Sequence, residues 1–490
     1  MQNSRRTFLK TSAAGAVTAA AAGSALAKGN TAIPAGPASQ ADVAQPAAVI
    51  EKKLANGEIS ARAIVERNLA NIANPDGEGK RAFVKVNVEQ ARAAADAIDL
   101  QRKAGLPLGP LAGLTIGVKD LFDTKGDVTL DGTIVMAKNA PATADATAIA
   151  RLRKAGAIII GRNTMVEAAY SGMGTNSHYG TPKNPYDRAT GRIPGGSTSG
   201  GAVAVADGMA FAAIGSDTGG SARIPAALCG LAGFKSSQFR IPLDGAVPLS
   251  TTLDSVGPIG RTVADLILLD AVMAGEAETT LTPVPLKGVR FLLPTNYMLD
   301  GVTDEVRHCF ERAVARIKAL GATVVEMDLP LLNKAGTVNP KGTLAAVEGH
   351  NVHRKYLEAS PEQYDPRVVK RILPGANIKG IDYAQTLKNV AEFGRDMTAA
   401  LAGFDGLISP TVVDIAPTIA EVTANEDEYY RFNGRMLRNC SVANLIDGCG
   451  ISVPCHAEGK APVGFMVTGV RGSDRRVLAI GLSLEAAFRG

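Results

Sequence analysis

Two segments rich in glycine and serine could position a nucleophile. Residues 194–201 read Pro-Gly-Gly-Ser-Thr-Ser-Gly-Gly, and residues 215–225 read Gly-Ser-Asp-Thr-Gly-Gly-Ser-Ala-Arg-Ile-Pro. Glycine adopts backbone angles that other residues rarely adopt, and it lets main-chain N–H groups approach a ligand closely. A serine at the end of such a turn can be exposed and also surrounded by hydrogen-bond donors. That arrangement suits a nucleophile beside an oxyanion hole.

Other interpretations of these segments are weaker. A single glycine-rich stretch is usually a flexible loop, but here two of them flank one hydrophobic segment. A phosphate-binding loop would need Gly-x-x-x-x-Gly-Lys-Ser/Thr, or Gly-x-Gly-x-x-Gly at the start of a helix, and these segments contain neither. Neither serine stands in Gly-x-Ser-x-Gly, which excludes the nucleophile elbow of α/β-hydrolases.

Lys119 is the third residue that could take part in this chemistry. It directly follows the apolar run 114–118, and Leu121 and Phe122 come soon after it. A lysine is usually a solvated surface charge, but apolar residues flank this one on both sides. Burial disfavours the ammonium form and lowers the pKa of a lysine, so a neutral Lys119 could act as a base.

Histidine and metal chemistry have less support. The five histidines lie in no recognisable motif (His178, His308, His350, His353 and His456), and we expect His178 to line or support the cleft. Glu348, His350 and His353 could suggest a metal site. However, His-Glu-x-x-His does not occur, and a polar helix face is the favoured interpretation. The predicted site therefore needs no metal and no organic cofactor.

Strands and helices alternate along the chain. The pattern predicts strands at 114–118, 157–160, 289–293, 323–327, 406–409 and 463–467. It predicts helices at 47–56, 61–70, 88–104, 146–154 and 304–320, with Ser60 as a helix cap, and a helix or a helix-to-strand passage at 203–213. Such alternation favours a layered α/β sheet. Without internal repeats or long linkers after residue 48, we expect one domain over residues 49–490.

These motifs resemble those of the amidase signature family of hydrolases. The family core, Gly-Gly-Ser-Ser-Gly-Gly and then Gly-Thr-Asp-Thr-Gly-Gly-Ser, is similar to residues 195–201 and 215–221. The Cys-Gly that closes the core is found at 229–230, and the family's Gly-Val-Lys-Asp at 117–120. The resemblance covers about residues 48–487. It implies an α/β fold with a mixed, twisted β-sheet covered by helices on both faces.

The resemblance also implies a catalytic triad. Ser221 would be the nucleophile, Ser197 the bridging serine after a cis peptide bond, and Lys119 the terminal base. An amide has a poor leaving group, so its nitrogen must be protonated as the tetrahedral intermediate collapses. A lysine and a serine in series can take the proton from Ser221 and return it to that nitrogen. The sequence departs from the family pattern at 198–199 and at Ser216, where threonine is usual.

Further site residues are expected around the triad. The backbone N–H groups implied for the oxyanion hole belong to Thr218, Gly219, Gly220 and Ser221. The side chains that would support this turn are Asp217 and Arg223. The expected substrate contacts, within 168–172, are Ala169, Tyr170 and Ser171. Tyr170 and Met173 suggest room for an apolar or aryl group, although such residues are as often part of a core.

The N-terminus has the features of an export signal. Residues 4–10, Ser-Arg-Arg-Thr-Phe-Leu-Lys, resemble the twin-arginine signal. The apolar run 13–22 is too short to cross a bilayer, and Ala-Leu-Ala follows at 25–27. A disordered basic tail is the alternative. We expect a signal peptide over 1–27, a flexible leader over 28–48, and a periplasmic or secreted protein without a stable membrane anchor.

The net charge of the mature chain limits which classes of partner to expect, and its cysteine content limits which disulfides to expect. Removing residues 1–27, which carry three basic groups and no acidic group, leaves 49 basic against 47 acidic residues. This balance argues against a nucleic-acid partner.

Five cysteines (Cys229, Cys309, Cys440, Cys449 and Cys455) are too few for a disulfide framework. Buried free thiols are the ordinary interpretation, with a Cys449–Cys455 bridge as the alternative. A homodimer is left open.

The sequence therefore predicts an exported amidase that hydrolyses a small carboxamide to an acid and an amine or ammonia through an acyl-enzyme. A urethane or ester hydrolase would use the same triad and is not separated by sequence. A glutamine-using component of an amidotransferase for charged transfer RNA is opposed by the export signal and the neutral mature charge. A catalytically silent amide-binding protein is opposed by the three intact catalytic positions.

Overall fold

Eleven strands form one sheet within residues 38–489, the part of the chain that the computed structural model describes. Their order across the sheet is β1-β3-β2-β4-β6-β5-β10-β11-β9-β7-β8. The strands are β1 (Phe83–Val86), β2 (Thr115–Lys119), β3 (Ile158–Asn163), β4 (Ala212–Ser216), β5 (Ala232–Lys235), β6 (Val256–Gly260), β7 (Arg290–Pro294), β8 (Thr323–Met327), β9 (Gly406–Pro410), β10 (Cys449–Pro454) and β11 (Gly464–Gly469).

The sheet is mixed. β2 pairs in parallel with β3 and β4, and β7 pairs in parallel with β8 and β9, whereas the pairs from β4 through β6, β5, β10 and β11 to β9 are antiparallel. Every residue of β2, β4, β6 and β9 is buried, as expected for strands that are covered on both faces. β8 forms one edge and is mostly exposed.

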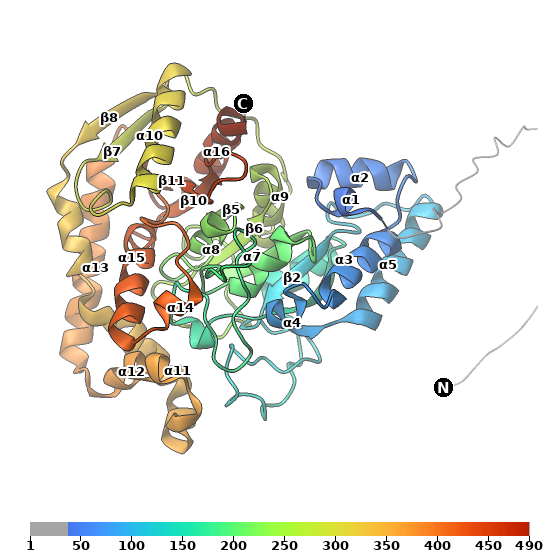
Figure 1. Cartoon of the computed structure of the whole chain (residues 1–490), viewed down its shortest axis with the longest axis horizontal. Helices are drawn as coiled ribbons and strands as arrows, with labels where there is room; N and C mark the ends of the chain where they lie inside the picture. The colour runs from blue at the N-terminus through green and yellow to red at the C-terminus, as the bar shows by residue number, and fades with distance from the viewer. Residues whose placement is uncertain (1–37, 490) are drawn as a thin grey trace, which may run out of the picture. The chain divides into compact units, whose positions relative to one another are not determined.

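Helices cover the sheet on both faces (Figure 1). α8 and α9 both contact β5 and β6. The α-helices are α1 (Gln40–Val43), α2 (Ala47–Ala55), α3 (Ala61–Ala73), α4 (Gly79–Ala82), α5 (Val88–Lys103), α6 (Thr147–Lys154), α7 (Ser199–Ala206), α8 (Arg223–Leu228), α9 (Val263–Ala274), α10 (Asp304–Ala319), α11 (Thr343–Ala359), α12 (Pro366–Ile372), α13 (Gly380–Ala400), α14 (Ile419–Val422), α15 (Glu426–Leu445) and α16 (Asp474–Arg489). The 3-10 helices are η1 (Glu167–Ala169), η2 (Pro330–Gly336), η3 (Pro340–Gly342), η4 (Pro361–Gln363) and η5 (Leu373–Asn377). The expected α/β fold is confirmed.

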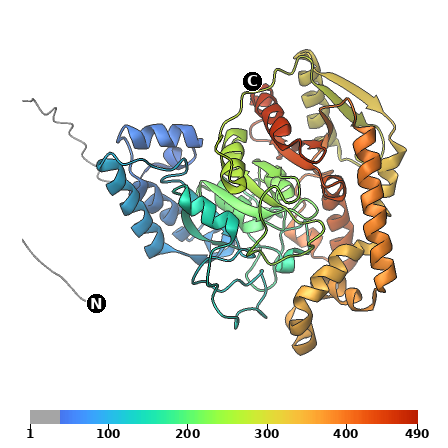
Figure 2. The ribbon, with the colours of Figure 1, turned by 180° about the vertical axis from the view of Figure 1, so that it is seen from behind.

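The C-terminal helices form a layer that reaches the catalytic motifs. α11, α13 and α15 are in contact in series, and both views of the ribbon show α13 along one side of this layer (Figure 1, Figure 2). α15 in turn contacts α8, which begins two residues after Ser221. This layer therefore brings residues that are far apart in the sequence to the turn that carries Ser221.

Most of the predicted elements agree with the structure. The strand expected at 323–327 is β8, and the helix expected at 304–320 is α10, which ends one residue earlier. The Ser60 side chain accepts a hydrogen bond from the Ala63 N–H at 3.0 Å and caps α3, as expected. Residues 203–213 are a passage from helix to strand, because α7 ends at Ala206 and β4 begins at Ala212.

The second half of the expected leader is part of the packed fold. Residues 40–43 form α1, in which Val43 is buried, and α2 begins at Ala47. The Ala47 N–H donates to the Asp265 carboxylate at 2.9 Å, which ties the start of α2 to α9. The expected signal peptide, 1–27, lies outside the described residues. Among residues 38–489, no helix is both long and apolar enough to span a membrane.

Candidate active site

Lys119 is the last residue of β2, the strand between β3 and β4. Its side chain has no exposed surface. The Nζ atom donates hydrogen bonds to Ser197 Oγ at 2.7 Å and to Ser216 Oγ at 2.8 Å. Ser216 ends the neighbouring strand β4, so adjacent strands deliver the amine and one of its two acceptors.

Burial changes the acid–base properties of this lysine. Loss of hydration disfavours the ammonium form and lowers the pKa of Lys119 to about 8, against the opposing effect of three carboxylates, Asp131, Asp254 and Asp217. A lysine with this pKa is neutral in an appreciable fraction of molecules near neutral pH. The neutral amine can therefore accept a proton from a hydroxyl group in contact with it. Ser197 Oγ is such a hydroxyl, at 2.7 Å from Lys119 Nζ.

Ser197 lies just before α7, in the first glycine-rich turn. The peptide bond between Gly196 and Ser197 is cis, the geometry that the family resemblance implies. The carbonyl of Ser197 accepts a hydrogen bond from the Val166 N–H at 3.1 Å, and the next residue, Thr198, donates its N–H to the Ser221 carbonyl at 3.2 Å. The two glycine-rich turns are thus bonded directly to each other.

The Asp217 carboxylate organises the turn that carries Ser221. It accepts hydrogen bonds from the N–H groups of Gly220 at 2.8 Å and Ala222 at 3.2 Å. It also pairs with the Arg223 guanidinium at 2.8 Å. Burial alone would raise the pKa of Asp217, but the charge and hydrogen bonds of Arg223 outweigh it and keep that pKa well below its usual range. Both residues take the supporting position expected from the sequence.

The backbone donors of the same turn differ in one respect from the expected oxyanion hole. The Gly220 N–H is already bonded to Asp217 and is not free to bind an oxyanion. Within residues 38–489, the N–H groups of Thr218, Gly219 and Ser221 have no hydrogen-bond acceptor, and Gly219 is partly exposed. The sequence could not reveal this difference, because the acceptor depends on how the turn folds around the carboxylate.

The two serine hydroxyls do not contact each other. Within the described residues, Ser221 Oγ forms no hydrogen bond. The two segments are connected instead through the backbone, where the N–H of Thr198, next to Ser197, donates to the Ser221 carbonyl. We expected Ser197 to bond both Lys119 and Ser221, and only the first bond is present. Hydrogen bonds among catalytic groups are often long without substrate and shorten when it binds.

Comparisons with known proteins identify the family. The amidase family model matches residues 63–478. The chain belongs to the amidase family.

The 2-amino-5-chloromuconic acid deaminase of Comamonas testosteroni is 33% identical to it over 400 residues, which cover 81% of this chain and 86% of that protein. One subunit of the glutamyl-tRNA(Gln) amidotransferase of Symbiobacterium thermophilum is 33% identical over 473 residues, covering 89% and 95%. A crystal structure of an amidase superposes with a TM-score of 0.80 at 32% identity and covers 91% of this chain and 100% of its own. This amidase is therefore a hydrolase of amide C–N bonds.

The segment expected to contact substrate in this amidase lies beside the C-terminal layer. The Tyr170 ring is buried, its hydroxyl donates to the Ala345 carbonyl, and Arg371 lies over its face at 5.4 Å. These contacts dock residues from α11 and α12 onto the segment and favour a packing role for Tyr170. Ala169 has a left-handed backbone with φ of 59°, and Ser171 Oγ donates to Asn433 Oδ1 of α15 at 3.0 Å.

The histidines and acids singled out from the sequence are distributed over separate networks. Glu348 accepts hydrogen bonds from the hydroxyl groups of Ser250 and Tyr383 at 2.5 and 2.7 Å. His353 lies apart from it and contacts Asp131 Oδ2 at 3.3 Å. Glu348 and His353 thus have different partners and do not converge on one point. His178 contacts a different acid, Glu167, near the segment expected to contact substrate.

The ring of His178 forms this contact. Its Nε2 lies 2.8 Å from the Glu167 carboxylate. Burial raises the pKa of Glu167 to about 8, so this acid is mostly protonated at neutral pH. Glu167 begins η1, the segment that leads into Tyr170. His178 therefore holds the start of the segment that leads into Tyr170.

Sequence reasoning missed two partners of the site. Asp254 accepts a hydrogen bond from the Thr218 hydroxyl at 2.5 Å, and burial raises the pKa of Asp254 to about 7. Asp254 begins the segment Asp-Ser-Val-Gly-Pro at 254–258, which leads into β6. Asn444 of α15 bonds both Asp217 and Arg223. It had no local signal, because its role depends on the packing of a distant helix.

Proposed function

We propose that this amidase cleaves a small carboxamide through an acyl-enzyme on Ser221, with Ser197 and Lys119 relaying the proton. The observation that carries the proposal is the buried Lys119 amine at 2.7 Å from Ser197 Oγ. A buried amine with a lowered pKa is a base, and the serine bonded to it connects that base to the turn of Ser221. The Thr198 N–H, bonded to the Ser221 carbonyl, keeps the two turns in register.

The proposed reaction has two halves. Ser221 Oγ attacks the carbonyl carbon while its proton passes to Ser197, and the Ser197 proton passes to Lys119. The N–H groups of Thr218 and Gly219 stabilise the oxyanion. The proton then returns through Ser197 to the amide nitrogen, the C–N bond breaks, and the amine or ammonia leaves. Water releases the acid by the same relay.

Active-site labelling tests this assignment. A fluorophosphonate should phosphonylate one serine, and mass spectrometry of the digested enzyme should place the group on Ser221. Ser221→Ala should lose both labelling and amide hydrolysis. Ser199→Ala is the matched control, because Ser199 lies in the neighbouring turn with its hydroxyl toward the Thr164 carbonyl at 3.5 Å. A label on another serine would refute the assignment of Ser221 as the nucleophile. The absence of any label would favour a silent amide-binding protein.

A second candidate is the ammonia-supplying component of an amidotransferase. The 33% identity to one subunit of a glutamyl-tRNA(Gln) amidotransferase favours it. The two functions differ in substrate, since that role requires glutamine as the amide donor. A panel of aryl, alkyl and peptide amides assayed beside glutamine separates them. Ammonia release from glutamine alone would support the amidotransferase role, and turnover of the other amides would support the amidase.

We also propose that the protein is exported by the twin-arginine route. The support is the string at 4–10 and the Ala-Leu-Ala at 25–27. The mature enzyme would begin near Lys28 and act in the periplasm or outside the cell. Amides present in the surroundings, rather than charged transfer RNA, would then be its substrates.

A further inference from the structure

Two of the five cysteines lie side by side. Cys309 is on α10, and Cys455 directly follows β10. Their Sγ atoms are 3.5 Å apart, although 146 positions separate them in the sequence. Both belong to a small apolar cluster with Val306, Val413 and Val463, away from Lys119 and the two serines. Nothing in the proposed reaction uses either thiol.

We infer that Cys309 and Cys455 are a disulfide site, which an external disulfide compound oxidises to a covalent link between α10 and the end of β10. A disulfide needs its sulfur atoms about 2.05 Å apart, so the thiols must approach by only about 1.5 Å. Side-chain rotation can supply a movement of that size. The site is independent of the proposed substrate, and export would only bring it into an oxidising compartment.

The other cysteines do not compete for this bond. Cys449 and Cys455 lie at opposite ends of β10, and six residue steps at about 3.3 Å each place them about 20 Å apart. The Cys449–Cys455 bridge considered from the sequence is therefore wrong. Cys449 contacts Ser473 Oγ at 3.4 Å instead, and Cys229 and Cys440 are buried, each with its Sγ 3.4 Å from a backbone carbonyl.

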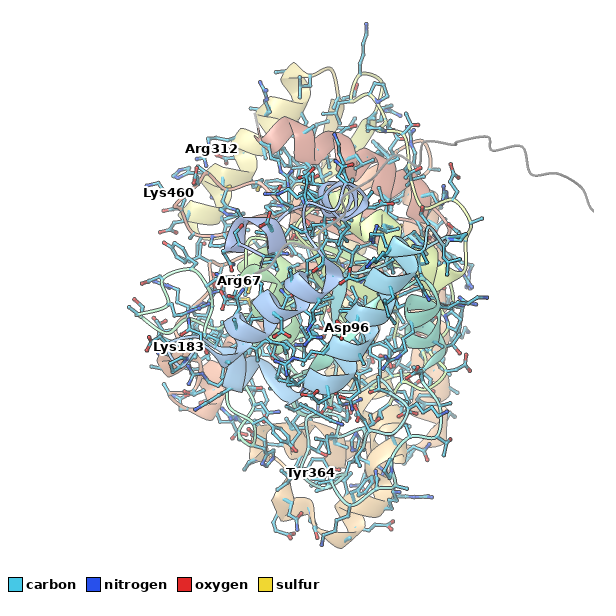
Figure 3. All side chains as sticks on the ribbon, turned by 90° about the vertical axis from the view of Figure 1, so that its right-hand side faces the viewer. Arg67, Asp96, Lys183, Arg312, Tyr364 and Lys460 are labelled. Carbon is cyan, nitrogen blue, oxygen red and sulfur yellow. The ribbon has the colours of Figure 1, made fainter. Side chains whose placement is uncertain are left out.

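The chemistry of the pair fits thiol–disulfide exchange. Cys455 is partly exposed, whereas Cys309 is buried behind it. The hydrogen bond with Cys455 lowers the pKa of Cys309, and the same contact raises the pKa of Cys455. Arg312, one turn further along α10, lowers the pKa of both. Figure 3 labels Arg312 and Lys460 of the β10–β11 loop toward the same edge of that view.

The exchange takes place in two steps. One Sγ of the pair, after losing its proton to solvent, attacks an external disulfide R–S–S–R, forms the mixed disulfide and releases one thiolate. The second Sγ, which also loses its proton, then attacks the first enzyme sulfur, forms the internal disulfide and releases the second thiolate. The two enzyme thiols lose two protons and two electrons, and the external disulfide is reduced to two thiols.

Oxidised glutathione tests the site on the purified, reduced, full-length enzyme. Thiol titration in denaturant should fall from five to three, and a non-reduced digest should contain one peptide pair, joined through Cys309 and Cys455. Closing so long a loop should raise the Tm by about 3–8 °C, and dithiothreitol should reverse the rise. Amide hydrolysis should change less than twofold, because the pair lies outside the site.

Single variants separate this link from other oxidation. Cys309→Ser and Cys455→Ser should each keep the reduced-state Tm within a few degrees and lose the response to oxidised glutathione. Cys449→Ser is the matched control and should keep it. Five titratable thiols after oxidation would overturn the inference. So would a link to another cysteine, or stable glutathione adducts without an internal bond.

Discussion

The Arg223 guanidinium and the Asp217 carboxylate are 2.8 Å apart, and neither side chain has any exposed surface. The same carboxylate accepts the N–H of Gly220, next to the nucleophile. The ion pair is therefore part of the turn itself and acts on Ser221 through the backbone. Its contribution should appear in folding stability and in activity together.

Breaking this pair should be strongly destabilising. Arg223→Met leaves a buried, unpaired carboxylate and should lower the free energy of unfolding by about 3–5 kcal/mol. Lys318→Met is the control, because its pair with Glu326 is 2.9 Å long but exposed, and it should cost less than about 1 kcal/mol. Urea denaturation at pH 7 measures both. Similar losses in the two variants would contradict this prediction.

The loss of folding stability at acid pH should depend in part on protonation of Asp217. Its pKa is lowered in the folded state, so its contribution is present above the unfolded-state pKa of about 4 and is lost as pH falls below that value. Urea midpoints from pH 7 to pH 2.5 should show a steeper decline for the wild type than for Asp217→Asn/Arg223→Met. Parallel declines would show that other carboxyl groups dominate.

Hydrolysis should accelerate as pH rises through the pKa of Lys119. Burial lowers that pKa to about 8, and only the neutral amine accepts the proton from Ser197. The kcat/KM of the wild type should therefore rise between pH 6 and pH 9 and then level off. Lys119→Ala should lack this rise. An unchanged profile in the variant would assign the titration to another group.

Loss of Lys119 should damage amide hydrolysis more than ester hydrolysis. An amine leaves only when protonated, whereas a phenolate departs unaided, so an aryl ester needs the returned proton far less. Lys119→Ala should therefore lower amide turnover by about 100-fold or more beyond its effect on an aryl ester of the same acid. Equal losses on both substrates would restrict Lys119 to a positioning role.

Gly220 should not tolerate a side chain. Its φ is 126°, and an added Cβ would lie 2.5 Å from Cys440 Cβ and 2.6 Å from Ile224 Cδ1. Gly220→Ala should lower the free energy of unfolding by about 2 kcal/mol or more and abolish activity. Gly219→Ala is the neighbouring control, since its nearest atom would be 3.3 Å away, and its unfolding midpoint should stay close to that of the wild type.

Export should depend on the arginine pair. Changing Arg5 and Arg6 to lysines should leave the protein in the cytoplasm, folded and active after lysis, because twin-arginine export carries folded proteins. Fractionation followed by amidase assay measures the distribution. Unchanged export of the double variant would contradict the proposed route.

The proximity of Lys119 to Ser197 could be predicted from the sequence because the motifs that carry them are local. Lys119 follows a strand made of apolar residues, and both serines lie in turns that glycine makes recognisable. The amphipathic helix at 304–320 was also predictable, since its period follows from its own residues. Strand order was not, because the pairing of β4 with β6 and β5 with β10 depends on side chains distant in the sequence. The contacts of Asn444 were missed for the same reason.

The bonds that Asn444 forms to Arg223 and Asp217 span 221 and 227 positions. A ribosome that has made Lys119 and both serines must therefore add more than two hundred residues before the nucleophile turn gains its last support. Contacts of such long range form late in folding. Hydrolytic activity should consequently appear only after α15 and the inner strands β10 and β11, which follow it in the sequence, have been released and packed, and shorter nascent chains should be inert toward amides.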